Sequence, residues 1–118
     1  MADASSYPVL FHCWAGADRA GTLAFLLNAL LGVSLEDLIR DYELSSLSVW
    51  GSRSRSAVEF GRMLEVLSGF GGSSGAIGQQ VEHFLLDSGV VSGEIRRFRE
   101  HLLEDVSLPE WGRFSESP

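Results

Sequence analysis

The chain has 118 residues, a hydrophobic fraction of 45% and a formal net charge of −7, a composition typical of a globular protein with an acidic surface. The excess of acidic residues argues against nucleic acid as a partner, and no apolar run reaches the ~20 residues of a membrane-spanning helix. The single cysteine excludes an internal disulfide and favours a reducing, cytoplasmic compartment.

The first predicted element is a short strand over residues 7–12, which read Tyr-Pro-Val-Leu-Phe-His. Its apolar centre is typical of a buried strand, and the chain then turns directly into a tight loop. Because a single strand cannot satisfy its own backbone hydrogen bonds, we expect neighbouring strands to come from a partner chain or a second copy, or the early residues of the chain to pair with it.

The loop over residues 13–19 places five residues between a cysteine and an arginine. This spacing lets successive backbone N–H groups at a helix N-terminus surround one phosphate group. Cys13 is the candidate nucleophile, since a helix N-terminus and a nearby arginine both stabilise a thiolate. Arg19 is a candidate catalytic residue that grips phosphate, because its planar guanidinium meets two oxygens at once. The alternative is a buried structural cysteine in front of an amphipathic helix.

The predicted phosphate-binding residues are the six that follow the cysteine: Trp14, Ala15, Gly16, Ala17, Asp18 and Arg19. Two roles are open for Asp18, which either protonates the leaving oxygen as a catalytic acid or braces the loop by accepting backbone hydrogen bonds. His12 is expected to support the loop and to lower the thiolate pKa by hydrogen bonding, with a packed core histidine as the alternative. Trp14 either lines the mouth of the pocket or anchors the loop in the core.

Two helices are predicted directly after the loop. A nearly apolar stretch from Leu23 to Leu31 predicts a buried helix that begins at about Gly21, and Gly32 is expected to end it. Ser34 is expected to cap a second helix, from Leu35 to about Leu44.

The middle of the chain is predicted to be a polar loop followed by a third helix. In the loop, residues 45–55, Arg53 and Arg55 either meet a second phosphate or lie solvated at the surface. Ser56 is the predicted cap of the third helix, and residues 70–75 form a connection rich in glycine and serine. The inner face of this helix is predicted to consist of Val58, Met63, Leu64 and Leu67.

Two further helices are predicted near the end of the chain. Gly89 is expected to stop the fourth, which runs from about Ile77 to Leu86, and Ser92 is expected to cap the fifth. Residues 106–118 contain two prolines and a glycine, which predicts a tail. The predicted inner faces are Val81, Phe84 and Leu85 on the fourth helix, and Ile95, Phe98, Leu102 and Leu103 on the fifth.

The loop and its flanks carry a family resemblance. Residues 12–21 read H-C-W-A-G-A-D-R-A-G and resemble the H-C-x-x-G-x-D-R-T-G signature of the bacterial-type protein tyrosine phosphatases. Residues 41–48 and 81–104 are similar to later segments of the same family. The resemblance implies a partial α/β tyrosine-phosphatase fold over residues 1–105, with one central loop strand and about five helices. It also implies that these residues correspond to the C-terminal half of the domain, without its N-terminal sheet strands.

The resemblance implies a cysteine-dependent phosphatase that acts through a phosphocysteine intermediate. Its expected substrates are phosphotyrosine-type monoesters, with phosphoserine, phosphothreonine and phosphoinositides as further candidates. The family carries Thr or Ser where this chain has Ala20, and that hydroxyl is held to donate to the departing sulfur. A phosphate-binding or phosphoprotein-binding module with little turnover is therefore the alternative. Sulfur-transfer and arsenate-reducing proteins also use such loops, but arsenate reductases need further cysteines.

The expected partners are a phosphorylated protein or a small phosphate monoester. For its fold, the chain is expected to need either a second copy or an N-terminal portion. No cofactor is expected. The three histidines, His12, His83 and His101, lack the spacing of metal ligands, so no metal site is predicted.

Overall fold

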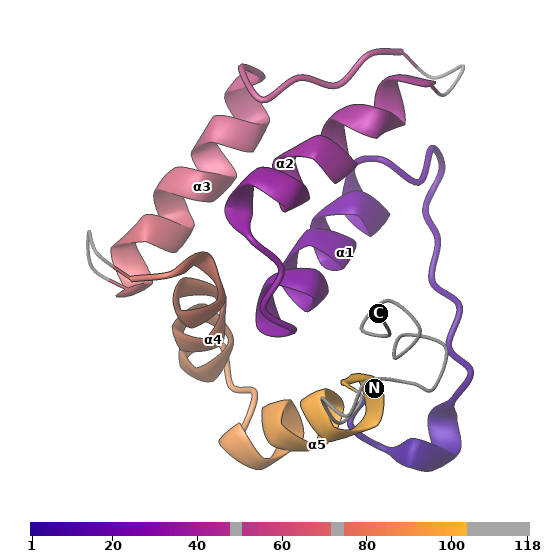
Figure 1. Cartoon of the computed structure of the whole chain (residues 1–118), viewed down its shortest axis with the longest axis vertical. Helices are drawn as coiled ribbons and strands as arrows, with labels where there is room; N and C mark the ends of the chain where they lie inside the picture. Colours follow the sequence, from indigo (N-terminus) through magenta and orange to yellow (C-terminus); the bar gives the residue numbers. More distant parts are fainter. Residues whose placement is uncertain (48–50, 72–74, 104–118) are drawn as a thin grey trace, which may run out of the picture.

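The computed structural model describes residues 1–47, 51–71 and 75–103. Within these ranges the chain forms helices and no strand (Figure 1). The predicted tail over residues 106–118 lies outside the described residues, as do residues 48–50 of the predicted loop. The elements in chain order are η1 (Ala4–Ser6), α1 (Arg19–Leu30), α2 (Leu35–Leu44), η2 (Ser45–Leu47), α3 (Val58–Gly71), α4 (Ile77–Asp87) and α5 (Ser92–Leu102).

The strand predicted over residues 7–12 is not formed, so the α/β class is not confirmed for the described residues. Figure 1 shows this segment as an irregular link that runs from η1 to α1 along the outside of the helices. The Leu10 side chain is 88% exposed, and Val9 and Phe11 are exposed as well. A strand needs a neighbour for its N–H and C=O groups, and no backbone hydrogen bond joins residues 8–12 to another described segment.

Three helix boundaries follow the predicted signals. Ser34 caps α2, because its Oγ accepts a hydrogen bond from Asp37 N–H at 3.2 Å. Gly32 and Gly89 follow the ends of α1 and α4 with φ angles of 93° and 106°. Glycine adopts this left-handed conformation without the strain that a side chain adds, so both residues end their helices as predicted.

Three other helices begin at residues that differ from the prediction. α1 begins at Arg19, inside the predicted loop. α3 begins at Val58, because Ser56 bonds to Ser54 through its main-chain N–H and its hydroxyl and so belongs to the preceding turn. α5 begins with Ser92 itself, and the residue before it occupies the capping position without a side-chain hydrogen bond. Serine satisfies backbone N–H groups both in turns and at caps, so its presence does not fix the boundary.

The core lies where α1, α3 and α4 meet. Ala29 of α1 and Val81 of α4 are fully buried, and Leu67 of α3 is nearly so. Gly78 allows α4 to approach α1 closely, since a Cβ at this position would lie 2.6 Å from the carbonyl oxygen of Ala29. The two helices therefore pack closer at this point than a side chain would permit.

The predicted inner faces are confirmed in the middle of the helices and are wrong at several helix ends. The buried members are Leu67, Val81, Ile95 and Phe98, and the partly buried ones that pack against them are Met63, Leu64, Phe84 and Leu85. The exposed members are Val58, Leu102 and Leu103. A helix end that extends past its neighbours exposes apolar residues that still keep the helical period.

The last helix is fixed to α1 and α4 by one arginine. Arg99 Nε donates to the Leu30 carbonyl at 2.8 Å, at the end of α1 where carbonyl groups lack helical partners. The same guanidinium forms an ion pair with Glu82 of α4 at 3.3 Å. Within the described ranges, no helix is long and apolar enough to cross a membrane.

Candidate active site

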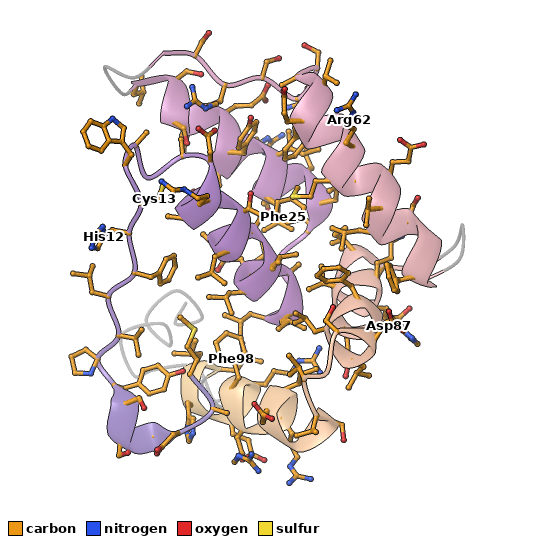
Figure 2. The ribbon with its side chains drawn as sticks, turned by 180° about the vertical axis from the view of Figure 1, so that it is seen from behind. His12, Cys13, Phe25, Arg62, Asp87 and Phe98 are labelled. Atoms are coloured by element: carbon orange, nitrogen blue, oxygen red, sulfur yellow. The ribbon has the colours of Figure 1, made fainter. Side chains whose placement is uncertain are left out.

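The loop over residues 13–18 leads into the N-terminus of α1 and turns its cysteine toward that helix. Gly16 has a φ of 73°, which glycine adopts without strain and which lets the chain fold back. Ala20 N–H donates a hydrogen bond to Cys13 Sγ at an N-to-S distance of 3.4 Å. Figure 2 shows Cys13 beside the first turn of α1. The sulfur therefore accepts from one of the N–H groups that a helix N-terminus leaves without a helical partner.

Backbone N–H groups of the loop lower the pKa of the Cys13 thiol below its ordinary value. The hydrogen bond from Ala20 contributes most, desolvation opposes it, and the N–H groups of Gly16, Ala15 and Arg19 add smaller contributions that also lower the pKa. These donors stabilise the thiolate more than the neutral thiol. The half-buried sulfur thus lies where several backbone N–H groups favour its negative charge.

Arg19 is the first residue of α1 and is exposed. In the part of the chain that the structure describes, no ion pair or side-chain hydrogen bond occupies its guanidinium. Arg19 is therefore an exposed cation at the start of the helix whose N-terminus bonds to the sulfur, and its guanidinium is a candidate to bind an anionic ligand. Of the other predicted loop residues, Ala17 is buried, whereas Trp14 is 79% exposed and not packed in the core.

Asp18 forms a two-point ion pair with Arg53, a residue 35 positions later in the chain. Arg53 Nε lies 3.0 Å from Asp18 Oδ1, and Arg53 NH2 lies 3.2 Å from Asp18 Oδ2. Asp18 occupies the N-cap position of α1 but makes no side-chain capping hydrogen bond. The carboxylate therefore pairs with a guanidinium, and no backbone bond of the predicted kind is seen for it within the described residues, so both roles considered for Asp18 stay predictions.

Sequence reasoning did not identify Arg53 as part of this site, although it singled the residue out as a candidate for a second phosphate. Arg55, the other arginine of that loop, bonds to Glu43 and Glu36 of α2. Nothing in the local pattern distinguishes the two arginines, because each finds its carboxylate through the folded arrangement of distant segments. The signal in the sequence was that Asp18 is the one acidic residue of its loop and that both arginines lie in a polar loop between two helices.

An apolar pocket of about 210 Å³ lies beside the loop, between α1, α2 and α3. Phe25 and Phe60 meet edge to face in its wall, and Tyr42 stacks on Phe60 with ring centroids 4.4 Å apart. Burial raises the pKa of the Tyr42 hydroxyl. Ala17 and Asp18 line the side of this pocket that faces the loop, while Cys13 and Arg19 do not line it. The pocket therefore lies next to the phosphate loop but does not contain the Cys13 sulfur.

His12 precedes the nucleophile but is exposed. Figure 2 shows its ring directed away from the helices, whereas Cys13 is directed toward α1. Within the described ranges no hydrogen bond from the His12 ring reaches the loop, and the groups that lower the pKa of Cys13 are backbone N–H donors, led by that of Ala20. The supporting role of His12 stays a prediction.

Comparison with known proteins identifies the family. Over residues 1–104 the chain matches the model of the "Tyrosine phosphatase family". It is also similar to a Cupriavidus necator protein named "Putative tyrosine-protein phosphatase", with 53% identity over 34 residues. That match spans 29% of this chain and 12% of the length of the relative. No solved structure matched significantly. On the strength of the match over residues 1–104, the chain belongs to the tyrosine phosphatase family.

Proposed function

We propose that this chain carries the catalytic loop of a cysteine-dependent phosphatase that hydrolyses phosphate monoesters. The observation that supports this most strongly is the hydrogen bond from Ala20 N–H to Cys13 Sγ, with the exposed Arg19 at the start of the same helix. An activated sulfur, a ring of N–H donors and a cation are the parts that phosphoryl transfer to a thiolate requires. The substrates and partners of the whole protein are part of this proposal.

The proposed reaction has two displacements at phosphorus. The Cys13 thiolate attacks phosphorus, an S–P bond forms, and the P–O bond to the alcohol or phenol breaks. The departing oxygen takes a proton from solvent or from an acid. Water then attacks phosphorus and loses a proton, the S–P bond breaks, and the thiolate and inorganic phosphate are released. In both steps Arg19 and the loop N–H groups stabilise the negative charge on the phosphoryl oxygens.

The proposed substrate class is an aryl phosphate of the phosphotyrosine type, on a protein or on a small molecule. The exposed Trp14, which follows Cys13 in the loop, supports this class, since an indole near a bound phosphate could stack on the phenyl ring of such a substrate. Phosphoserine, phosphothreonine and phosphoinositides are further proposed substrates that do not use such stacking.

A second candidate function is a phosphate-binding module with little turnover. Residue 20 is an alanine, so this position supplies no hydroxyl to stabilise the sulfur as it leaves phosphorus. The Ala20 main-chain N–H does donate to Cys13 Sγ, which supports the catalytic proposal over the binding module. The two functions make the same prediction for phosphate binding and different predictions for turnover.

The test combines protection of Cys13 with hydrolysis of a chromogenic aryl phosphate by the whole chain. Inorganic phosphate or vanadate is expected to slow alkylation of Cys13 in the wild type, and Arg19→Ala should abolish this protection. Arg96→Ala is the matched control, because Arg96 is an exposed arginine on α5. Aryl phosphate hydrolysis that disappears in Cys13→Ser supports the phosphatase. Protection without hydrolysis establishes the binding module instead, and absence of protection overturns both functions.

A further inference from the structure

We propose that Arg53 is a positioning residue for the phosphate loop, which neutralises Asp18 and holds its carboxylate aside so that the loop attracts an oxyanion. This inference rests on the proposed phosphate-binding function of the loop. It assigns a role to an arginine that lies outside the cysteine-to-arginine motif and approaches it from the segment between α2 and α3.

The geometry of the pair places both carboxylate oxygens of Asp18 on one guanidinium. The two contacts are 3.0 Å from Nε to Oδ1 and 3.2 Å from NH2 to Oδ2, a two-point arrangement that fixes orientation as well as distance. The Arg53 side chain is 17% exposed, whereas that of Asp18 is 68% exposed. The shielded member of the pair is therefore the arginine, and the aspartate is the exposed loop residue that it holds.

Arg53 is itself held on several sides. Its main-chain N–H donates to Ser46 Oγ at 2.8 Å, and the same hydroxyl donates back to its carbonyl at 2.9 Å. Its remaining nitrogen, NH1, donates to the carbonyls of Gly51 and Ser52 at 3.3 and 3.2 Å. These bonds turn the Nε and NH2 edge toward Asp18. The guanidinium therefore occupies its position before any ligand enters, which reduces the entropy that the pair would otherwise lose.

The charge of Asp18 is what makes this pairing important. The residue adjoins Arg19 and precedes α1, so its carboxylate stands in the loop that is proposed to receive a phosphate dianion. An uncompensated negative charge there opposes both the dianion and the Cys13 thiolate. The chain as a whole carries a net charge of −7, so its general field does not favour anions either. Arg53 offsets the negative charge of the Asp18 carboxylate, within the phosphate loop itself.

Arg55 provides a matched comparison within the same loop. Its guanidinium also binds carboxylates at two points, but these belong to Glu43 and Glu36 of α2 and not to the phosphate loop. Loss of Arg55 therefore removes a similar ion pair without changing the charge balance at Asp18 in the phosphate loop.

The experiment measures how strongly inorganic phosphate or vanadate protects Cys13 from alkylation in the whole chain. We expect Arg53→Ala to weaken oxyanion binding roughly threefold to tenfold, since one nearby partly screened charge is left uncompensated. Arg55→Ala is expected to stay within about twofold of wild type, as an exposed ion pair away from the site does. Adding Asp18→Asn to Arg53→Ala should restore much of the affinity, because it removes the charge that Arg53 offsets.

Recovery of oxyanion affinity when Asp18→Asn is added distinguishes compensation of the Asp18 charge from a purely structural role of the ion pair. If the pair only held the loop in shape, losing both partners would be no better than losing one, and failure of the double variant to recover would overturn the proposal. Arg53→Gln serves as a second variant, checked by circular dichroism, in case Arg53→Ala does not fold, and it should show the same loss and the same recovery. If phosphate or vanadate protects Cys13 equally well in the wild type, Arg53→Gln and Arg53→Ala, the role of Arg53 is overturned and the proposed function is not. Absence of protection in the wild type overturns the proposed function first, and this role with it.

Discussion

At the scale of single residues, Cys13 owes its acidity to the main chain and not to neighbouring side chains. The donors are N–H groups of its own loop and of the first turn of α1, led by that of Ala20. Such donors need only the correct backbone path, which Gly16 permits through its positive φ. The local sequence predicts this part of the site, because a cysteine, a glycine and an arginine at fixed spacing specify the path.

The lowered pKa of Cys13 predicts a shifted pH dependence of alkylation. The midpoint in the folded chain should lie below that of the same chain unfolded in denaturant. A depressed pKa also links ionisation to folding. The contribution to stability is complete above the pKa of the unfolded thiol and is lost as the pH falls through the lower pKa of the folded thiol. Equal midpoints in the folded and unfolded chain would contradict the stabilisation of the thiolate by the loop.

Ala20 predicts a separation between formation and breakdown of the phosphocysteine. With a chromogenic aryl phosphate, whose good leaving group needs little help from an acid, we expect a burst of product about equal to the enzyme and then slow turnover. Ala20→Thr should accelerate the slow phase and leave the burst rate nearly unchanged, because a hydroxyl there acts on the departing sulfur. Rapid-quench measurements test this, and steady turnover that is unaltered in Ala20→Thr would show that residue 20 is neutral.

At the residue scale, the ion pair between Arg53 and Asp18 could not be predicted from the sequence. Asp18 lies 35 positions away from Arg53, and the contact exists only because the segment after α2 folds back onto the start of α1. Arg55 has the same local surroundings in sequence and binds to α2 instead. Local patterns indicate which residues carry charge, but the fold decides which charges meet.

At the scale of elements, short-range signals predicted the helices well and long-range pairing poorly. Ser34, Gly32 and Gly89 act within one turn of themselves, so their effects on helix ends could be predicted from the sequence. The strand over residues 7–12 depends on a neighbour that no local pattern supplies, and it is not formed. A strand is a property of a pair of segments, whereas a helix satisfies its own backbone.

The close crossing of α1 and α4 predicts opposite effects for two glycine substitutions. Gly78→Ala should lower the free energy of unfolding by roughly 1–3 kcal/mol, because its Cβ would lie 2.6 Å from the Ala29 carbonyl oxygen. Gly61→Ala in α3 is the matched control, since its Cβ meets nothing within 4 Å. It should raise the free energy of unfolding by up to about 1 kcal/mol through helix propensity. Urea denaturation measures both, and equal effects would contradict the close packing at Gly78.

At the scale of the whole molecule, the chain is less compact than an isolated domain of its length. The Cα radius of gyration is 16.4 Å, compared with about 13–14 Å expected for a compact domain of this size. The irregular link before α1 contributes exposed apolar side chains, including Leu10. Within the described residues, no backbone hydrogen bond joins residues 8–12 of this link to another segment. These two features favour pairing of this link with a second copy of the chain.

This surface predicts self-association that depends on Leu10. Sedimentation equilibrium of the wild-type chain should show a dimer or a larger assembly, and Leu10→Lys should shift the mass toward the monomer. Leu47→Lys is the matched control, because Leu47 is 87% exposed, against 88% for Leu10, but lies in η2. A compact wild-type monomer with a cooperative melting transition would contradict this prediction.

The central claim is that Cys13 accepts a phosphoryl group from a phosphate monoester, and trapping the intermediate tests it most directly. The whole chain is mixed with an aryl phosphate, quenched with denaturant at alkaline pH within the burst phase, digested and analysed by mass spectrometry, with Cys13→Ser as the control. The slow breakdown expected with Ala20 should favour accumulation of the intermediate. The account predicts one added phosphoryl group on the peptide that contains Cys13 and none in Cys13→Ser. Release of the aryl alcohol without a phosphoryl group on Cys13, or with one on another residue, would contradict it.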